Sequence, residues 1–184
     1  MADTGDVTTL NTLIITLIDS IEGYETSAGD VRDPALAQRF TARAQERRRA
    51  VSDLQEVVRR LGGTPADDGS LAAGAHRMFV NLKQTVTGGD DTAVVNEVER
   101  GEDYLKGKFE AALKMDDLGA EARQAVSQAW DSVKAGHDEM SALKHRREGA
   151  GDYAERQSDT AYAREQEYAS ESDSSLRRDD GSLI

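Results

Sequence analysis

Apolar residues recur at the period of an α-helix through four long segments of this 184-residue chain. In the first segment, from about Val7 to Val31, one helical stripe contains Leu10, Leu13, Ile14, Leu17, Ile18, Ile21, Tyr24 and Ala28. Good helix formers such as Ala, Leu, Glu, Arg and Gln are common in these segments, and the whole chain has only two prolines. The pattern therefore predicts an all-α protein.

Turn signals predict how the helices are connected. We expect long helices at about residues 7–31, 34–61, 92–114 and 120–147. Asp33-Pro34 joins the first two, because proline suits the first turn of a helix, and Met115 to Gly119 joins the last two. Between these antiparallel hairpins lies a long crossover connection, in which Ser70 to Thr87 is predicted to form a shorter amphipathic helix. This is the connectivity of a ferritin-like four-helix bundle.

Composition limits the possible partners. A net charge of −12 disfavours nucleic acid and anionic membrane surfaces, because both would repel the protein. The absence of cysteine excludes disulfides, thiolate metal sites and a cysteine nucleophile. The apolar run from Leu10 to Ile21 is too short to span a bilayer and is interrupted by Asp19. We therefore expect a soluble, cytoplasmic protein.

Residues 148–184 differ from the rest of the chain. They contain ten acidic and four basic side chains, a net charge of −6, and almost no large aliphatic residues. Such a segment buries too little apolar surface to offset the entropy of ordering. We predict a bundle of residues 1–147 and an acidic, largely disordered tail, within which the last helix could continue around Tyr153 to Tyr168.

Four long polar side chains fall where the helical period calls for core residues: Glu25, Arg47, Glu102 and His137. A buried charge without a partner is very costly, so these groups are expected to pair with one another or with a cation. One interpretation is a buried polar network in which the Arg47 guanidinium binds carboxylates. The alternative is a metal site, with iron as the metal and with Glu25, Glu99, Glu102 and His137 as ligands.

The network is the better supported interpretation. A di-iron carboxylate bundle requires a Glu-x-x-His pair on each of two helices. The second predicted helix contains no histidine, and the residue three positions before His137 is Lys134. No phosphate loop, nucleophile motif or zinc motif occurs elsewhere. The sequence therefore predicts no catalytic residue and no cofactor.

Several short motifs occur in order along the chain: Leu61-Gly62-Gly63-x-Pro65, Gly69-Ser70, His76-Arg77, Leu82-Lys83, Glu99-Arg100-Gly101-Glu102-Asp103 and Val133-Lys134-x-x-His137-Asp138. Over residues 8–147 the chain resembles a bacterial ferritin-like family catalogued as a domain of unknown function. The resemblance implies a ferritin-like bundle, often linked with stress conditions and without an established reaction. The chain departs from the family pattern at Met78-Phe79, where the family tends to have a tryptophan, and in the arginine run at residues 47–49.

The end of the tail carries a second resemblance. Ser174 to Arg178 and Asp180 to Ile184 are similar to the Gly-Ser-Leu cores of C-terminal peptides that load cargo into encapsulin shells. The resemblance implies that Leu176, Leu183 and Ile184 are apolar anchors and that Gly181-Ser182 belongs to the motif. In that case the partner is an encapsulin shell and the protein lies inside its compartment. The alternative is an acidic terminus that ends in Ser-Leu-Ile by chance.

These observations favour a non-catalytic, stress-associated structural or interaction protein. The main alternative is an iron-binding protein of ferroxidase-like or storage function, loaded into an encapsulin through its tail. We also expect a homo-oligomer, most simply a dimer. The apolar stripe of residues 70–87 would then either cover one end of the bundle or pair with a second subunit.

Overall fold

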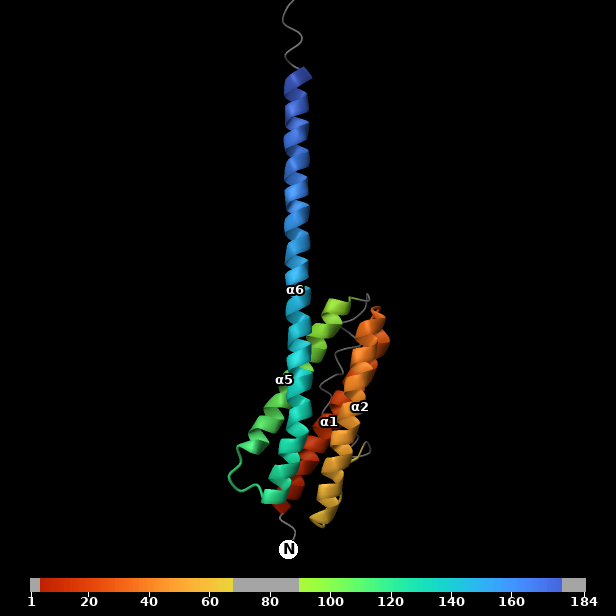
Figure 1. The fold of residues 1–184 in the computed structure, drawn as a ribbon, viewed down its shortest axis with the longest axis vertical. Helices are drawn as coiled ribbons and strands as arrows, with labels where there is room; N and C mark the ends of the chain where they lie inside the picture. The colour runs from red at the N-terminus through yellow and green to blue at the C-terminus, as the bar shows by residue number, and fades with distance from the viewer. Residues whose placement is uncertain (1–3, 68–89, 177–184) are drawn as a thin grey trace, which may run out of the picture. The chain divides into compact units, whose positions relative to one another are not determined.

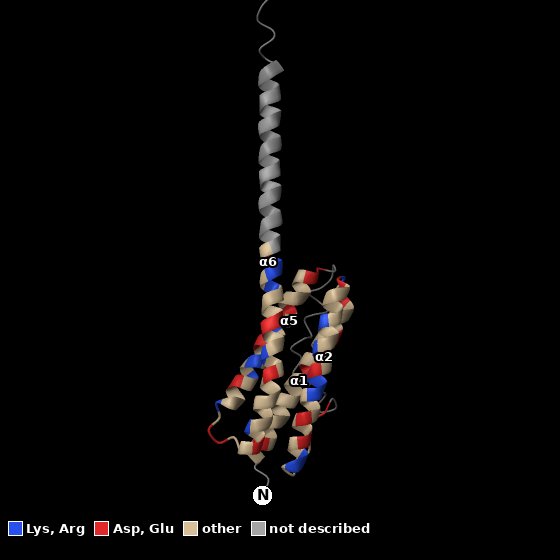
Figure 2. Cartoon of the chain, viewed as in Figure 1, with Lys and Arg blue, Asp and Glu red and all other residues tan. Residues whose placement is uncertain are grey.

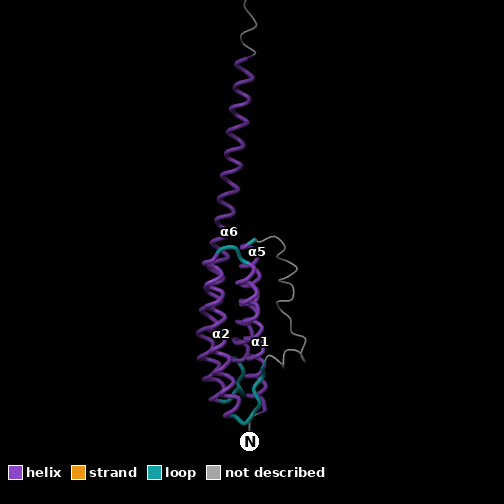
Figure 3. Tube along the Cα trace, turned by 90° about the vertical axis from the view of Figure 1, so that its right-hand side faces the viewer, coloured by secondary structure: helices purple, strands orange, loops and turns teal. Residues whose placement is uncertain are grey.

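The computed structural model describes residues 4–67 and 90–176, with side chains up to residue 149. The chain divides into two units, Met1–Lys144 and His145–Ile184. The helices of the described residues are α1 (Thr4–Asp30), α2 (Pro34–Arg60), α5 (Asp91–Leu113) and α6 (Ala120–Leu176), and these residues form no strand (Figures 1 and 3). The prediction of an all-α bundle of four long helices is confirmed.

The helix ends agree with the sequence signals except at the end of α6. This helix begins at Ala120 as predicted but continues past Arg147 to Leu176, so the predicted end is wrong. No proline follows Arg147, and the next residues are rich in helix formers that outweigh Gly149 and Gly151. The continuation considered for Tyr153 to Tyr168 lies within this helix.

The described helices do not test two further predictions. The shorter helix expected at Ser70 to Thr87 lies outside the described residues. The division of the chain into a bundle of residues 1–147 and a tail of residues 148–184 stays a prediction.

Local side chains explain where α2 and α5 begin and end. The Asp33 carboxylate accepts a hydrogen bond from the Ala35 N–H at 2.8 Å, and Asp90 accepts one from the Thr92 N–H at 2.9 Å. Both are N-cap interactions. α2 ends at Arg60, and after its C-cap Leu61 comes Gly62, whose φ of 79° is a left-handed conformation that favours glycine.

The core of the first unit lies between stripes of apolar side chains on the four helices. Fully buried members are Leu10, Ile14, Leu17, Phe40, Leu54, Val58, Val94, Val95, Phe109, Val126, Val133 and Met140. Tyr24 packs on Phe40 with ring centroids 5.9 Å apart, which joins α1 to α2. Within residues 4–67 and 90–176, no helix has the length and apolarity that a membrane span requires.

Two carboxylates hold helix ends against turns that are distant in sequence. Asp6, which is 5% exposed, accepts a hydrogen bond from the Gly119 N–H at 2.9 Å, so the start of α1 is tied to the turn between α5 and α6. Asp91 accepts hydrogen bonds from the backbone N–H groups of Arg32 and Asp33 at 2.8 and 3.0 Å. These contacts fix the two hairpins against each other at both ends of the bundle.

Replacing Asp6 by alanine should lower the free energy of unfolding by about 1–3 kcal/mol, because the partly buried Gly119 N–H would lose its partner. Urea unfolding followed by circular dichroism measures the change. Asp117→Ala, an exposed residue of the same turn, is the matched control and should change stability by less than about 0.5 kcal/mol. Equal effects of the two substitutions would contradict this role of Asp6.

Candidate functional site

The centre of the bundle contains a fully buried ion pair. Arg47 of α2 is 0% exposed and Glu102 of α5 is 1% exposed. Nη2 of Arg47 donates to Oε2 of Glu102 at 2.8 Å and to Oε1 at 3.1 Å, while Nη1 donates to the Ser132 hydroxyl of α6 at 2.9 Å. The Ser20 hydroxyl of α1 lies 3.5 Å from Oε1 of Glu102. One pair of charges thus connects all four helices.

A glycine of α6 makes room for the pair. A Cβ atom at Gly136 would lie 2.9 Å from Oε2 of Glu102 and would overlap Nη2 of Arg47. Sequence reasoning did not identify Gly136 or Ser132 as part of the site. The available signal was a glycine inside a helix, between the core positions Val133 and Met140, which indicates a close approach by another group.

Tyr24 of α1 lies beside the ion pair. Burial raises the pKa of the Tyr24 hydroxyl well above its usual value, the negative charge of Glu102 raises it further, and Arg47 opposes the shift. The Tyr24 hydroxyl has no hydrogen-bond partner among the described residues. We therefore attribute the effect of Glu102 on this pKa to its nearby negative charge. Tyr24 therefore stays neutral at physiological pH.

Glu25 does not belong to this site. Its side chain is 49% exposed and pairs with Arg48 of α2, so the prediction that Glu25 faces the interior is wrong. The buried positions of this part of α1 are Tyr24 and Ser27. Because each residue advances a helix by about 100°, Glu25 is turned away from the core that its neighbour Tyr24 enters.

His137 also lies outside the central network. Its side chain is 15% exposed, with Nε2 3.0 Å from Oδ1 of Asp103 and Nδ1 3.2 Å from Oδ1 of Asp138. Gly136 occupies the inward position, and the next residue faces the edge between α5 and α6. The prediction that His137 joins the buried network is therefore wrong, and the network itself contains Arg47 and Glu102.

Three acidic residues within one short stretch of α5 pair with three different basic side chains. The pairs are Glu99 with Lys144 at 3.0 Å, Glu102 with Arg47 at 2.8 Å, and Asp103 with His137 at 3.0 Å. Their partners lie on α2 and α6. The acidic side chains of α5 therefore diverge toward separate partners.

The alternative ligand set Glu25, Glu99, Glu102 and His137 is not brought together. Each of its members contacts a different partner, and Glu25 faces the outside of the bundle. Over the part of the chain that the structure describes, no group of three or more His, Asp or Glu residues is placed to hold a metal ion.

The proposed targeting residues are only partly within the structure. Leu176 is the last residue of α6, and Gly181, Ser182, Leu183 and Ile184 lie outside the described residues. Loading into an encapsulin through these residues stays a prediction.

Comparison with known families supports the fold. Residues 6–115, more than half of the chain, match the domain of unknown function DUF2383. The chain belongs to the DUF2383 family. The DUF2383 match includes Arg47 and Glu102 and ends before Ser132 and Gly136, the residues of α6 that complete the site.

One solved structure extends this comparison. It is a crystal structure of a two-domain protein from Anabaena variabilis that contains DJ-1/ThiJ/PfpI-like and ferritin-like domains. The similarity has a TM-score of 0.61 at 19% identity and covers 77% of this chain but only 39% of that one. At this identity the likeness shows the fold alone, which is ferritin-like. No curated protein matches the chain.

Breaking the central pair from one side should be strongly destabilising. Arg47→Met leaves the buried Glu102 carboxylate without its cation, and we expect a loss of about 3–5 kcal/mol in the free energy of unfolding. The double variant Arg47→Met/Glu102→Leu should lose less stability than either Arg47→Met or Glu102→Leu alone, because it leaves no charge unpaired. Denaturant unfolding of the three variants measures these losses. The control Arg48→Met removes an exposed partner of Glu25 and should cost at most about 1 kcal/mol.

Gly136→Ala tests the close packing around the same pair. We expect it to destabilise the protein by about 1–3 kcal/mol, because the added methyl group forces the two charges to move. Gly107→Ala is the control: that glycine lies exposed in α5, with no atom within 4 Å of the added Cβ. It should stabilise the protein by about 0.4–1 kcal/mol. A stabilising effect at both positions would contradict the packing argument.

Proposed function

We propose that this protein is a non-catalytic ferritin-like bundle with a structural or interaction function. The observation that carries the proposal is the fully buried ion pair between Arg47 and Glu102. In this interpretation the guanidinium supplies the positive charge that bound metal ions supply in the carboxylate members of the fold.

The chemistry of arginine supports this role. A guanidinium is always charged and presents several donors in a rigid plane, so it satisfies a buried carboxylate permanently. Here it contacts both oxygens of Glu102. A divalent cation at the same place would be repelled by Arg47 and would have to compete for oxygen atoms that are already hydrogen-bonded. The site is therefore better suited to holding the helices than to exchanging ions.

The neighbouring acidic side chains support the same conclusion. Glu99 accepts a hydrogen bond from Lys144, and both ring nitrogens of His137 face the carboxylates of Asp103 and Asp138. A metal site would require several of these groups to turn away from their partners and converge. The sequence resemblance supports a function under stress conditions, and the acidic composition and short apolar run support a location in the cytoplasm.

Anaerobic loading with Fe(II), followed by desalting and elemental analysis, tests the proposal. We expect no stoichiometric iron in the wild-type protein and no oxygen consumption above that of free Fe(II). The variants Glu99→Gln and His137→Ala remove two of the alternative ligands. Glu99 is buried, but glutamine keeps its shape and its partner Lys144 is partly exposed, so the fold should tolerate both changes. Both should behave as the wild type does.

Stoichiometric iron that is retained by the wild-type protein and lost in either variant would overturn the proposal. The protein would then be an iron-binding bundle. Circular dichroism of each variant checks that lost binding does not reflect lost structure.

A further inference from the structure

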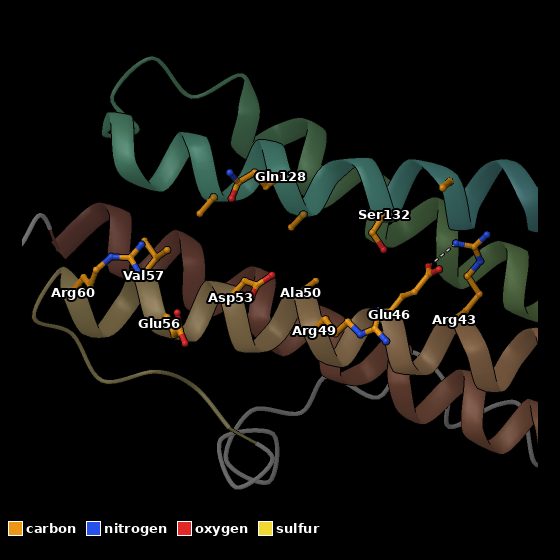
Figure 4. A pocket seen from close by; sticks show the side chains of 13 residues that line it. Arg43, Glu46, Arg49, Ala50, Asp53, Glu56, Val57, Arg60, Gln128 and Ser132 are labelled. Atoms are coloured by element: carbon orange, nitrogen blue, oxygen red, sulfur yellow. Dashed lines mark hydrogen bonds and ion pairs between the residues drawn. The ribbon is translucent and has the colours of Figure 1, made fainter.

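A furrow runs along the surface between α2 and the part of α6 that belongs to the first unit (Figure 4). It encloses about 570 Å³. α2 contributes Arg43, Glu46, Arg49, Ala50, Asp53, Glu56, Val57 and Arg60 to its walls, and α6 contributes Ala125, Gln128, Ala129, Ser132 and Ala135. The short side chains of α6 leave the space between the two helices open.

Ion pairs close the furrow at both ends. Arg60 pairs with Glu121 at 2.7 Å at one end, and Arg39 and Arg43 pair with Glu139 at 2.7 Å at the other. Burial alone would raise the pKa of Glu139, but the hydrogen bonds and charges of the two arginines outweigh it and lower the pKa. These pairs join α2 to α6 at both ends of the furrow.

Three charged residues in the middle of the furrow lack such partners. Arg49, Asp53 and Glu56 are exposed and line the α2 wall, and none of their side chains forms a hydrogen bond or ion pair with another described residue. The charged residues on either side of them, Glu46 and Arg60, are both paired. The three unpaired charges are available to an outside partner.

The spacing of these charges suits a second copy of the same helix. Arg49 and Glu56 are seven residues apart, which is about two turns or 10 Å along one face of α2. If two α2 helices meet antiparallel about a two-fold axis midway between these positions, Arg49 of each copy faces Glu56 of the other. Asp53 lies next to this two-fold axis, within one helical turn of Arg49 of the other copy. The α2 face is thus self-complementary in charge.

The net charge of the chain also favours α2 as the contact between two copies. Two copies that each carry a net charge of −12 repel each other, so they should meet where basic residues balance the acidic ones. α2 contains seven arginines and three acidic residues, whereas α1 contains five acidic and no basic residues (Figure 2). We propose that α2, with the furrow beside it, is the contact through which two copies of this chain form a dimer.

The proposed α2 contact lies on the surface of the bundle and does not depend on whether the interior binds metal. A chain that does not dimerise through α2 would therefore leave the proposed function unaffected.

A charge swap tests the pairing directly. Sedimentation equilibrium of the full chain should give a dimer for the wild type. Arg49→Glu and Glu56→Arg each place like charges opposite each other twice, and each should raise the dimer dissociation constant by about tenfold or more. The double variant Arg49→Glu/Glu56→Arg exchanges the two signs, and it should restore the wild-type dissociation constant.

Lys114→Glu and Asp117→Arg are the matched controls, since they change the net charge equally at exposed positions outside the furrow. Neither should change the dissociation constant by more than about twofold. A monomeric wild-type chain would overturn the inference. Dimers that survive both single reversals would also overturn it, as would a double variant that remains monomeric although it is folded by circular dichroism.

Discussion

The arrangement of the four helices depends on one buried pair of charges. Arg47 and Glu102 are shielded from water, and each is acceptable in the core only because the other is there. The pair binds Ser132 of α6 and lies near Ser20 of α1, so its partners come from every helix of the bundle. A shift of one helix by a single residue would turn one charge away from its partner. The pair therefore selects one register, whereas apolar packing alone tolerates several.

The same interaction explains how the described helices form a ferritin-like fold although their carboxylates do not converge. Glu99, Glu102 and Asp103 lie within five residues of α5, yet each contacts a different basic side chain. Three separate pairs distribute the negative charge that a metal centre would concentrate. Fold and chemistry are thus independent here: the bundle geometry remains, and its function follows from what the inward and outward side chains contact.

The sequence predicted the fold, and two of the four polar residues that its period placed in the core are buried there. Helix ends are set by local groups such as Asp33 and Gly62, which are visible in the sequence. The period placed Arg47 and Glu102 correctly in the core but also placed Glu25 and His137 there, one residue from the true inward positions Tyr24 and Gly136. An apolar stripe is about 100° wide, as is one residue step, so periodicity cannot separate neighbours. Gly136 has no side chain to contribute to the apolar period. Its role becomes clear only in the structure, where Arg47 packs against it.

The arginine run at residues 47–49 shows how one short segment serves three parts of the molecule. Successive residues of a helix point about 100° apart, so three adjacent arginines face three directions. Arg47 enters the core and binds Glu102, Arg48 pairs with Glu25 on the side of α1, and Arg49 lines the furrow beside α6. Each direction meets a different environment: a buried carboxylate, an exposed carboxylate, and a wall with unpaired charges of both signs. A run that composition alone describes as basic therefore acts as three separate contacts, and only the innermost one is required for the fold.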